Sequence, residues 1–390
     1  MEIANRMDRL SESITIAITT LSRELKDSGK DVLSFSAGEP DFGTPQVIKD
    51  SAIKAMQNDD TKYTAVEGTP ACREAVVEKL KRDNNLDYDP SEIIVSVGAK
   101  HSLFNIFQAG ISKGDEVIIP APYWVTYPEL VKYSEGTVVE ILTDDKSSFK
   151  ITPEQLKNAI TPKSKMLVLT TPSNPTGSVY TKDEILALGE VLKDTNITVI
   201  SDEMYEKLVY DSSDFTAVAS VSEDMFARTI TVNGLSKSVA MTGWRFGYLA
   251  SKDKELVKAM KKLQSQSTSN INSITQAAAI TALNGDADND IETMRIQFEK
   301  RRDLAVELMN DIDGLSVVKP NGAFYLFVNI KEISNDSMEF SKQLLEKVGV
   351  AVVPGVAFGL EGYFRLSFAT DEDTIKDGIS RIKQYTDSLK

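Results

Sequence analysis

Short apolar runs rich in valine, isoleucine and threonine recur through the middle of the chain and alternate with amphipathic segments. The runs cover 92–98, 115–122, 165–172, 197–203 and 229–234. Each run ends in small or polar residues, which is typical of strands buried in a parallel sheet. Helix-like segments lie between them, such as 181–194, which Thr181 and Glu184 open as a capping box. Strands that alternate with helices predict an α/β fold with a mostly parallel sheet.

The pattern changes near residue 286. A long charged helical pattern is followed by three strand-like runs and a last helix, at 291–312, 322–330, 351–355, 363–369 and 371–385. This order predicts a smaller α+β domain. The first 45 residues fit neither block well. We therefore predict a large domain over 46–285, a small domain over 286–390, and a segment, 1–45, that joins the small domain.

Composition narrows the class of protein. The chain has 390 residues, of which 41% are hydrophobic and 26% charged, as in an ordinary soluble globular protein. Lysine and arginine number 44 against 58 acidic residues, a net charge of −14 that argues against a nucleic-acid partner. No apolar run is long enough for a membrane span, and the first residues lack the apolar stretch of a signal peptide.

The chain contains one cysteine, Cys72, and one histidine, His101. An intrachain disulfide is therefore impossible, which fits a reducing compartment and predicts a cytoplasmic location. A metal site built from histidine and cysteine is nearly excluded, and we predict no metal. A serine or cysteine nucleophile paired with histidine is excluded unless it uses His101.

Residues 233–248, NGLSKSVAMTGWRFGY, surround Lys237 with small residues and place Arg245 eight positions further on. A solvated surface lysine needs no such neighbours, whereas a lysine that bonds a flat cofactor in a tight space does. Two more motifs, SNPTG at 173–177 and SDE at 201–203, follow or end predicted strands. Each alone is a common turn or helix start. Together they lie at the strand ends where α/β sheets bind ligands.

The chain resembles the class I aminotransferases of the fold-type-I pyridoxal-phosphate enzymes, from AGEPDF at 37–42 to FRLSFAT at 364–370. The most specific signature is Gly-Leu-Ser-Lys followed by Gly-Trp-Arg-Phe-Gly. The chain is most similar to the aspartate aminotransferase branch that carries KY, VGAK, PYW, NPTG, SDEMY and TGWRFGY in this order. The resemblance implies transamination between aspartate and 2-oxoglutarate, with pyridoxal phosphate as the cofactor.

The resemblance assigns roles toward the cofactor's ring. Lys237 would bond the cofactor covalently and, once displaced, carry a proton; burial should lower its pKa so that the amine is reactive. Asp202 would keep the ring nitrogen protonated and make the ring an electron sink. Asn174 and Tyr205 would hydrogen-bond the phenolic oxygen.

The resemblance also places the cofactor's phosphate. A helix that starts directly after a strand would offer the N–H groups of Ala99 and Lys100, and Arg245 a fork of donors. Gly234 stands where some relatives carry a serine that contributes a hydroxyl. The phosphate site would then lack one hydrogen bond, unless Ser236 supplies it.

Two aromatic residues complete the expected cofactor site. Trp124 matches the residue that stacks on the cofactor's ring, although a buried core tryptophan is the alternative. Tyr63 resembles the tyrosine that reaches the phosphate from the neighbouring subunit. This likeness implies a homodimer with composite active sites.

A dicarboxylic substrate would present two carboxylates, each best held by a cation. By resemblance Arg365 holds the α-carboxylate, with Asn174 and Gly38 completing that pocket. Lys100 and Thr15 would bind the side-chain carboxylate.

Lys100 also has a second interpretation, as a phosphate contact or a solvated cation. Some aspartate aminotransferases bind the side-chain carboxylate with an arginine of the partner subunit, in a segment that corresponds to 265–273, but this chain has no arginine there. Ser13 lies near Thr15 in the sequence and could add a hydroxyl.

Other activities share these cofactor residues. A prephenate, aromatic or branched-chain aminotransferase and a C–S lyase on the same fold are the alternatives within the cofactor class. A non-catalytic regulator is the alternative outside it. The retained Lys237 and the lack of room for a DNA-binding module argue against a regulator.

Overall fold

The apolar runs of the sequence form the central sheet of the larger part of the molecule. The computed structural model describes residues 2–12, 14–211 and 214–390, and in these residues the sheet has seven strands in the order β2-β8-β7-β6-β5-β3-β4. They are β2 (Ile93–Val97), β3 (Glu116–Ala121), β4 (Thr137–Leu142), β5 (Ser164–Thr170), β6 (Thr198–Asp202), β7 (Thr229–Gly234) and β8 (Phe246–Ala250). Neighbours from β7 to β4 are parallel, whereas β8 is antiparallel to β7 and β2. The predicted α/β fold with a mostly parallel sheet is confirmed.

The five predicted strands are present, but the prediction missed β4 and β8. β4 is an edge strand, and only one of its six residues is buried, so its apolar pattern is weak. The first residues of β8, from Phe246, belong to the lysine signature at 233–248. Gly247 of β8 allows a close approach, because a Cβ there would come within 2.2 Å of the Ala99 nitrogen.

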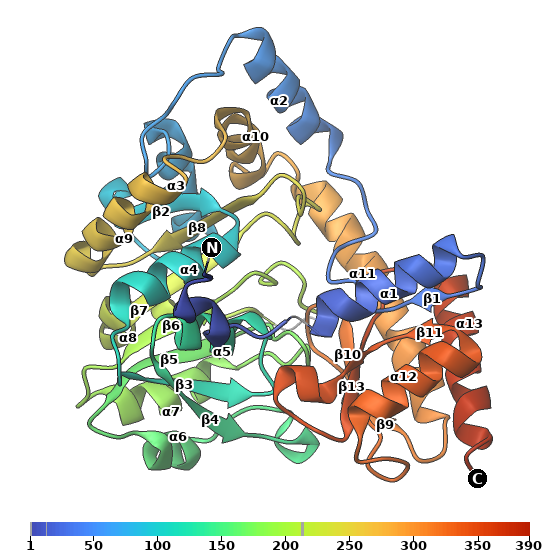
Figure 1. The fold of residues 1–390 in the computed structure, drawn as a ribbon. Coiled ribbons are helices and arrows are strands. Elements are labelled where there is room, and N and C mark those ends of the chain that lie inside the picture. The colour runs from blue at the N-terminus through green and yellow to red at the C-terminus, as the bar shows by residue number, and fades with distance from the viewer. Residues whose placement is uncertain (1, 13, 212–213) are drawn as a thin grey trace.

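Helices cover the central sheet, as Figure 1 shows. They are α3 (Pro70–Asn84), α4 (Ala99–Gly110), α5 (Thr126–Tyr133), α6 (Pro153–Ala159), α7 (Lys182–Leu192), α8 (Glu223–Arg228), α9 (Lys254–Ser267) and α10 (Ser273–Leu283), with α2 (Gln46–Gln57) packed on α10. The predicted capping box opens α7: Thr181 accepts from the Glu184 N–H, and the Glu184 carboxylate accepts from the Thr181 N–H at 2.8 Å.

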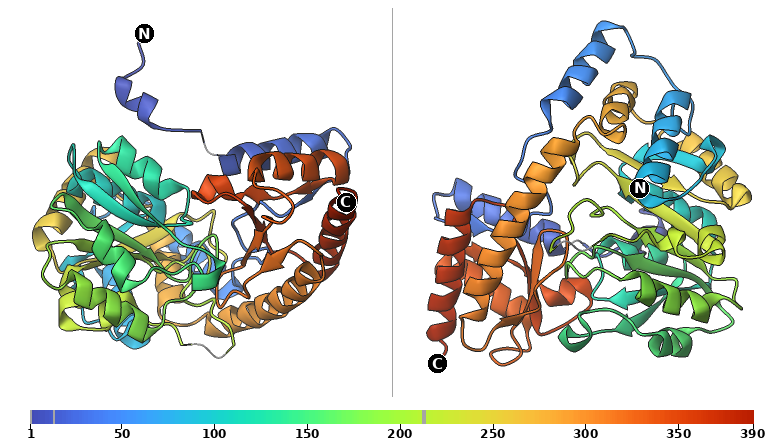
Figure 2. Two further views of the ribbon diagram at one scale, coloured as in Figure 1. Left: turned by 90° about the horizontal axis from the view of Figure 1, so that it is seen from below. Right: turned by 180° about the vertical axis from the view of Figure 1, so that it is seen from behind.

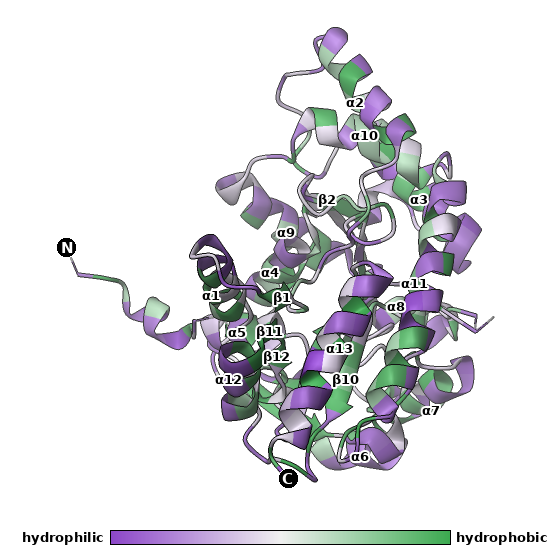
Figure 3. Cartoon of the chain, turned by 90° about the vertical axis from the view of Figure 1, so that its right-hand side faces the viewer, coloured by the Kyte–Doolittle hydropathy of each residue, from purple (hydrophilic) through white to green (hydrophobic). Residues whose placement is uncertain are grey.

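The smaller part contains an antiparallel sheet and a parallel pair of strands. Within the described residues the sheet order is β12-β13-β10-β9. Its strands are β9 (Ser316–Val317), β10 (Tyr325–Asn329), β12 (Val353–Pro354) and β13 (Tyr363–Ser367). The helices are α1 (Ile14–Asp27), α11 (Asp288–Asn310), α12 (Ser337–Val348) and α13 (Glu372–Asp387). Figure 3 shows β10 in green behind α13, whose visible face is mostly purple, as expected of a core strand under an amphipathic helix.

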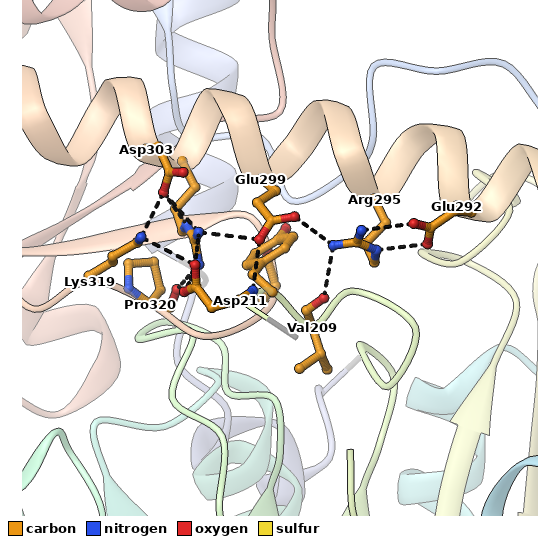
Figure 4. A network of polar contacts seen from close by, with 11 residues as sticks. Val209, Asp211, Glu292, Arg295, Glu299, Asp303, Lys319 and Pro320 are labelled. Carbon is orange, nitrogen blue, oxygen red and sulfur yellow. Dashed lines mark hydrogen bonds and ion pairs between the residues drawn. The ribbon is translucent and has the colours of Figure 1, made fainter. Parts of the chain in front are cut away.

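A polar network joins α11 to a loop of the larger part (Figure 4). Arg302 is fully buried, and its guanidinium donates two hydrogen bonds to Asp211, at 2.7 and 2.8 Å, and one to the Pro320 carbonyl. Lys319, at the surface, forms an ion pair with Asp211 in which Nζ and Oδ1 are 3.3 Å apart. The loop after β6 is thereby fixed against the segment that leads into β10.

The N-terminal segment contacts both parts of the molecule. Its first residues stand away from the body in Figure 2, and Arg9 pairs with Glu135 of the larger part at 2.8 Å. Further on, β1 (Leu33–Ser34) pairs in parallel with β11 (Val350–Ala351) of the smaller part. The division at residues 45 and 285 stays a prediction. None of the helices in the described ranges is both long and apolar enough to cross a membrane.

Candidate active site

A cavity of about 750 Å³ lies between the central sheet and the smaller part. Its walls combine strand ends, the start of α4, the start of α1 and strand β13. Of the site residues predicted from the sequence, it is lined by Thr15, Gly38, Ala99, Lys100, Trp124, Asn174, Asp202, Tyr205, Ser236, Lys237, Arg245 and Arg365. Residues far apart in the sequence therefore meet in one chamber.

Lys237 follows β7 and reaches into this cavity. Its Nζ donates to the Gly38 carbonyl at 2.5 Å. Desolvation, opposed by the Glu39 carboxylate and assisted by the Arg365 guanidinium, lowers the pKa of the Lys237 amine to about 8. A sizeable neutral fraction of the amine therefore exists near neutral pH, as a nucleophile requires.

Asp202 is the last residue of β6 and is only 5% exposed. Its Oδ2 accepts from the Tyr127 hydroxyl at 2.7 Å, and its Oδ1 accepts from the Met204 N–H at 3.3 Å. Burial raises the pKa of the Asp202 carboxyl, whereas the two hydrogen bonds and the Lys237 charge lower it. No sequence pattern points to Tyr127, because its contact with Asp202 spans 75 residues.

Tyr205 also faces the cavity, and its hydroxyl hydrogen-bonds the Tyr325 hydroxyl at 2.8 Å. Tyr325 belongs to β10 and lines the same cavity. It is a second site residue that the sequence did not reveal. The run that contains it was recognised only as a strand.

Arg365 lies on β13 and is 2% exposed, although an arginine opposite an apolar stripe is normally solvated. Its guanidinium donates to Asn174 Oδ1 at 2.9 Å and to the Ser36 carbonyl at 2.8 Å, and it lies 4.4 Å from the ring centroid of Tyr325. Arg365 Nε is buried and has no hydrogen-bond partner within the described residues. A buried cation with a free donor fits an anionic ligand such as a carboxylate.

Helix α4 begins at the cavity without a side-chain cap. Its N-cap, Gly98, has φ of 80°, and a Cβ there would lie 2.6 Å from Arg245 Nη2. The uncapped N–H groups and the guanidinium thus converge, which suits a phosphate dianion. At Gly234 a Cβ would come within 2.7 Å of the Phe246 carbonyl, so a serine there would clash. The hydroxyl-bearing Ser236 lines the cavity.

Lys100 and Trp124 lie at one side of the cavity, where the lysine Nζ is 5.0 Å from the indole centroid. Desolvation and the nearby Arg245 lower the pKa of Lys100. Thr15 lines the same cavity, and its buried Oγ1 has no partner in the ranges that the structure covers. Ser13, the suggested neighbour of Thr15, lies outside the described residues.

Tyr63 is the predicted residue that does not line this cavity, and it is 93% exposed. His101 and Cys72 do not line it either. Cys72 is buried, and burial raises the pKa of its thiol to about 12, so it is not a reactive thiolate.

The donor set fits pyridoxal phosphate. An amine of lowered pKa, a buried carboxylate, an uncapped helix start beside an arginine and an indole all line one cavity. The free donors of Arg365 and Thr15 remain for a further ligand. No group of three or more potential metal ligands occurs in the part of the chain that the structure describes.

Comparisons with known proteins agree with this fit. The family model for class I and II aminotransferases matches residues 30–382. An aspartate aminotransferase from Geobacillus stearothermophilus is 47% identical, with 100% of both chains covered. A probable aspartate/prephenate aminotransferase from Rickettsia bellii is 46% identical, with 99% of both covered. The structure of an aspartate aminotransferase from Thermus thermophilus with maleate has a TM-score of 0.95 and 41% identity, covering 98% of this chain and 99% of that one.

Proposed function

The chain belongs to the class I and II aminotransferases, which depend on pyridoxal phosphate, and on this premise we propose that it transfers the amino group of aspartate to 2-oxoglutarate. The observation that carries the proposal is one cavity whose lining includes Arg365 and Lys100, the two cations that we assign to the substrate, together with the reactive amine of Lys237. A dicarboxylic amino acid carries two anionic groups that need two cations. The names of the Geobacillus and Thermus relatives support the same substrate class, since maleate is a dicarboxylate.

The bound cofactor supplies an electron sink for the electrons left on the substrate's α-carbon when its proton is removed. Lys237 would hold the cofactor covalently and, once released as a free amine of low pKa, would take that proton. Asp202 would stabilise the proton of the ring nitrogen, and Tyr205 and Asn174 would hydrogen-bond the phenolic oxygen. Trp124 would stack on the ring and exclude water from it.

The start of α4 would bind the phosphate through the N–H groups of Ala99 and Lys100, together with the fork of Arg245. Ser236 would supply the hydroxyl, since Gly234 has no space for one. These contacts would hold the cofactor within reach of the Lys237 amine.

Arg365 binds the α-carboxylate with its guanidinium, next to Asn174 and Gly38. Lys100 and Thr15 bind the side-chain carboxylate from the opposite side of the substrate. Because lysine is a compact point charge, this contact orients the carboxylate less rigidly than an arginine fork would. We therefore expect some activity with other amino acids.

Lys100→Ala tests the substrate assignment. It should reduce kcat/KM for aspartate by a factor that corresponds to about 1–3 kcal/mol of lost transition-state stabilisation. The reduction for alanine or phenylalanine should be much smaller. Lys132→Ala is the matched control, because Lys132 lines the same cavity but pairs with Glu129 at 3.2 Å. Equal losses for acidic and neutral substrates would mean that Lys100 serves the phosphate, and the dicarboxylate preference would be withdrawn.

The main alternatives use the same cofactor site. Prephenate or an aromatic amino acid would enter as a substrate if the cavity accepts larger side chains, and a C–S lyase would release a thiol and ammonia. A panel of amino acids in single half-reactions separates these activities by the product formed. Release of a thiol or a preference for aromatic donors would replace the aspartate assignment.

We also infer a homodimer with composite sites. Tyr63 lies on the surface, away from its own chain's cavity, and α2 beside it exposes Ile53 and Met56. Tyr63 would then complete the phosphate site of a second copy. Mixing Tyr63→Phe protein with Lys237→Ala protein should yield hybrid dimers with one intact site and partly restored activity. An active monomer in sedimentation would end this inference.

Two further expectations belong to the same proposal. Residues 46–285 form the domain that binds the cofactor, and 286–390, joined by 1–45, form the smaller domain that supplies Arg365. A cytoplasmic location suits a chain whose single cysteine, Cys72, makes no disulfide. Cell fractionation tests the location, and limited proteolysis near residue 286 tests the boundary.

A further inference from the structure

Tyr127 lies in the first turn of α5 and is 1% exposed. Its hydroxyl is 2.7 Å from Asp202 Oδ2 and 2.8 Å from Thr170 Oγ1. Thr170 ends β5, the strand beside β6, which ends at Asp202. Three polar side chains thus form a continuous chain across the edge of the sheet.

The direction of these hydrogen bonds follows from the chemistry of the groups. An ionised carboxylate only accepts hydrogen bonds, so the single proton of the Tyr127 hydroxyl goes to Asp202. The Thr170 hydroxyl must then donate to the Tyr127 oxygen. Burial and the Asp202 charge raise the pKa of Tyr127 well above its usual value, so this phenol donates its proton and does not release it.

The ring of Tyr127 has a second contact in the site. It packs against the Trp124 ring edge-to-face, with centroids 5.5 Å apart and planes at 86°. The Tyr127 N–H also donates to the Trp124 carbonyl at 3.1 Å. Tyr127 therefore contacts both the Asp202 carboxylate and the Trp124 indole, which we assign to the cofactor site.

We propose that Tyr127 is a positioning residue that keeps the Asp202 carboxylate ionised and aimed at the cofactor's ring nitrogen, and that Thr170 sets the direction of its hydroxyl. Within the described residues Asp202 accepts from only two donors, Tyr127 and the Met204 N–H, and the Tyr127 bond is the shorter. A buried carboxylate with so few donors tends to take up a proton. A protonated Asp202 would no longer hold the proton of the ring nitrogen. The inference rests on the proposed role of Asp202, but not on the proposed substrate.

The test measures cofactor affinity without any substrate. Two ligands are compared: pyridoxal phosphate, and an analogue with a carbon atom in place of the ring nitrogen. Tyr127→Phe removes the hydroxyl but keeps the ring against Trp124. We expect it to weaken pyridoxal phosphate binding about tenfold, the effect of one hydrogen bond to a charged group, and to change the affinity for the analogue by less than about twofold.

Tyr180→Phe is the matched control. Tyr180 is also a buried tyrosine, but its hydroxyl accepts from the Ile151 N–H at 2.9 Å, away from the cavity. Tyr180→Phe should leave the ratio of the affinities for pyridoxal phosphate and for the analogue unchanged. Thr170→Val, which leaves Tyr127 in place, should weaken only pyridoxal phosphate binding, by about threefold, and Thr170→Ser should restore it.

Asp202→Asn tests the proposed role of Asp202 separately from the proposed role of Tyr127. If Asp202→Asn weakens the binding of both ligands equally, the proposed role of Asp202 is wrong and this inference falls with it. If Asp202→Asn weakens only pyridoxal phosphate binding but Tyr127→Phe and Thr170→Val do not, only this inference is overturned. An equal loss of both affinities in Tyr127→Phe would also overturn it, because a merely structural role predicts that result.

Discussion

Glu203, the residue after Asp202, is a buried carboxyl group whose replacement should stabilise the protein at alkaline pH. Its side chain is fully buried, and its Oε1 accepts from the Ser201 hydroxyl at 2.8 Å and from the Val218 N–H at 3.0 Å. Its Oε2 is buried and has no partner in the described part of the chain. A carboxyl in this environment is better accommodated as the neutral acid.

Burial, with a contribution from the Glu206 charge, raises the pKa of Glu203 from an ordinary 4.5 to about 8. The unfolded chain loses this proton near pH 4.5, whereas the folded protein keeps it up to about pH 8. Between these values the folded state binds one more proton, so stability falls by about 1.4 kcal/mol per pH unit. Glu203 contributes fully to the free energy of unfolding below pH 4.5, and this contribution is lost above pH 8. Its upper limit is about 5 kcal/mol.

Glu203→Gln cannot ionise and keeps an oxygen that can accept from Ser201 and Val218. It should match the wild type in free energy of unfolding near pH 5 and exceed it by a few kcal/mol near pH 9. Urea unfolding at both pH values gives these free energies, provided that fluorescence and circular dichroism report the same transition. The cofactor is removed first, because its binding also stabilises the folded state.

Glu206→Gln provides the contrast. Glu206 pairs with Lys79, which is 5% exposed, and accepts from Asn84 at 2.7 Å. Its loss leaves Lys79 without its ionised partner and should destabilise the protein at both pH values. If Glu203→Gln differs from the wild type by the same amount at pH 5 and pH 9, Glu203 is not a neutral buried acid and the reasoning is refuted.

Two further outcomes are expected. Arg302→Ala should lower the free energy of unfolding by about 2–3 kcal/mol, because it removes a fully buried side chain and leaves the carbonyl of the buried Pro320 without this donor. Lys319→Ala, at the exposed edge of the network, should cost less than about 1 kcal/mol. Urea unfolding compares the two variants, and equal costs would contradict the assignment. Borohydride should fix pyridoxal phosphate to the peptide that contains Lys237, and cofactor should load onto cofactor-free protein faster as pH rises through about 8, because only the neutral amine attacks; attachment at another lysine would contradict this.

The sequence predicted the central sheet and most of the cavity wall for the same physical reason. Buried strands appear as short apolar runs, and the polar residues that follow them must meet at one edge of a parallel sheet. Asp202, Asn174 and Lys237 all follow or end such runs, so their convergence could be expected before any coordinates. Their chemical roles came from the resemblance, and they remain proposals.

Tyr127 and Tyr325 could not be found in this way. Tyr127 meets Asp202 across 75 residues, and Tyr325 meets Tyr205 across 120 residues. No periodicity or spacing encodes such a contact, because it depends on how separate elements pack. Tyr325 belongs to a run whose pattern predicts only a strand, and no sequence pattern marks Tyr127. Both tyrosines contact residues that do belong to a recognisable motif.

Gly234 shows a different limit of sequence interpretation. The sequence suggested a missing hydroxyl at this position, whereas in the structure the position has no space for a side chain. A Cβ at Gly234 would meet the Phe246 carbonyl at 2.7 Å, and one at Gly247 would meet the Ala99 nitrogen at 2.2 Å. Gly234 lets β7 pair closely with β8 within the sheet, and Gly247 lets the start of α4 approach β8. The start of α4, to which we assign the phosphate, can therefore take its position only because these glycines have no side chains. A search of the sequence for polar groups does not detect such a feature.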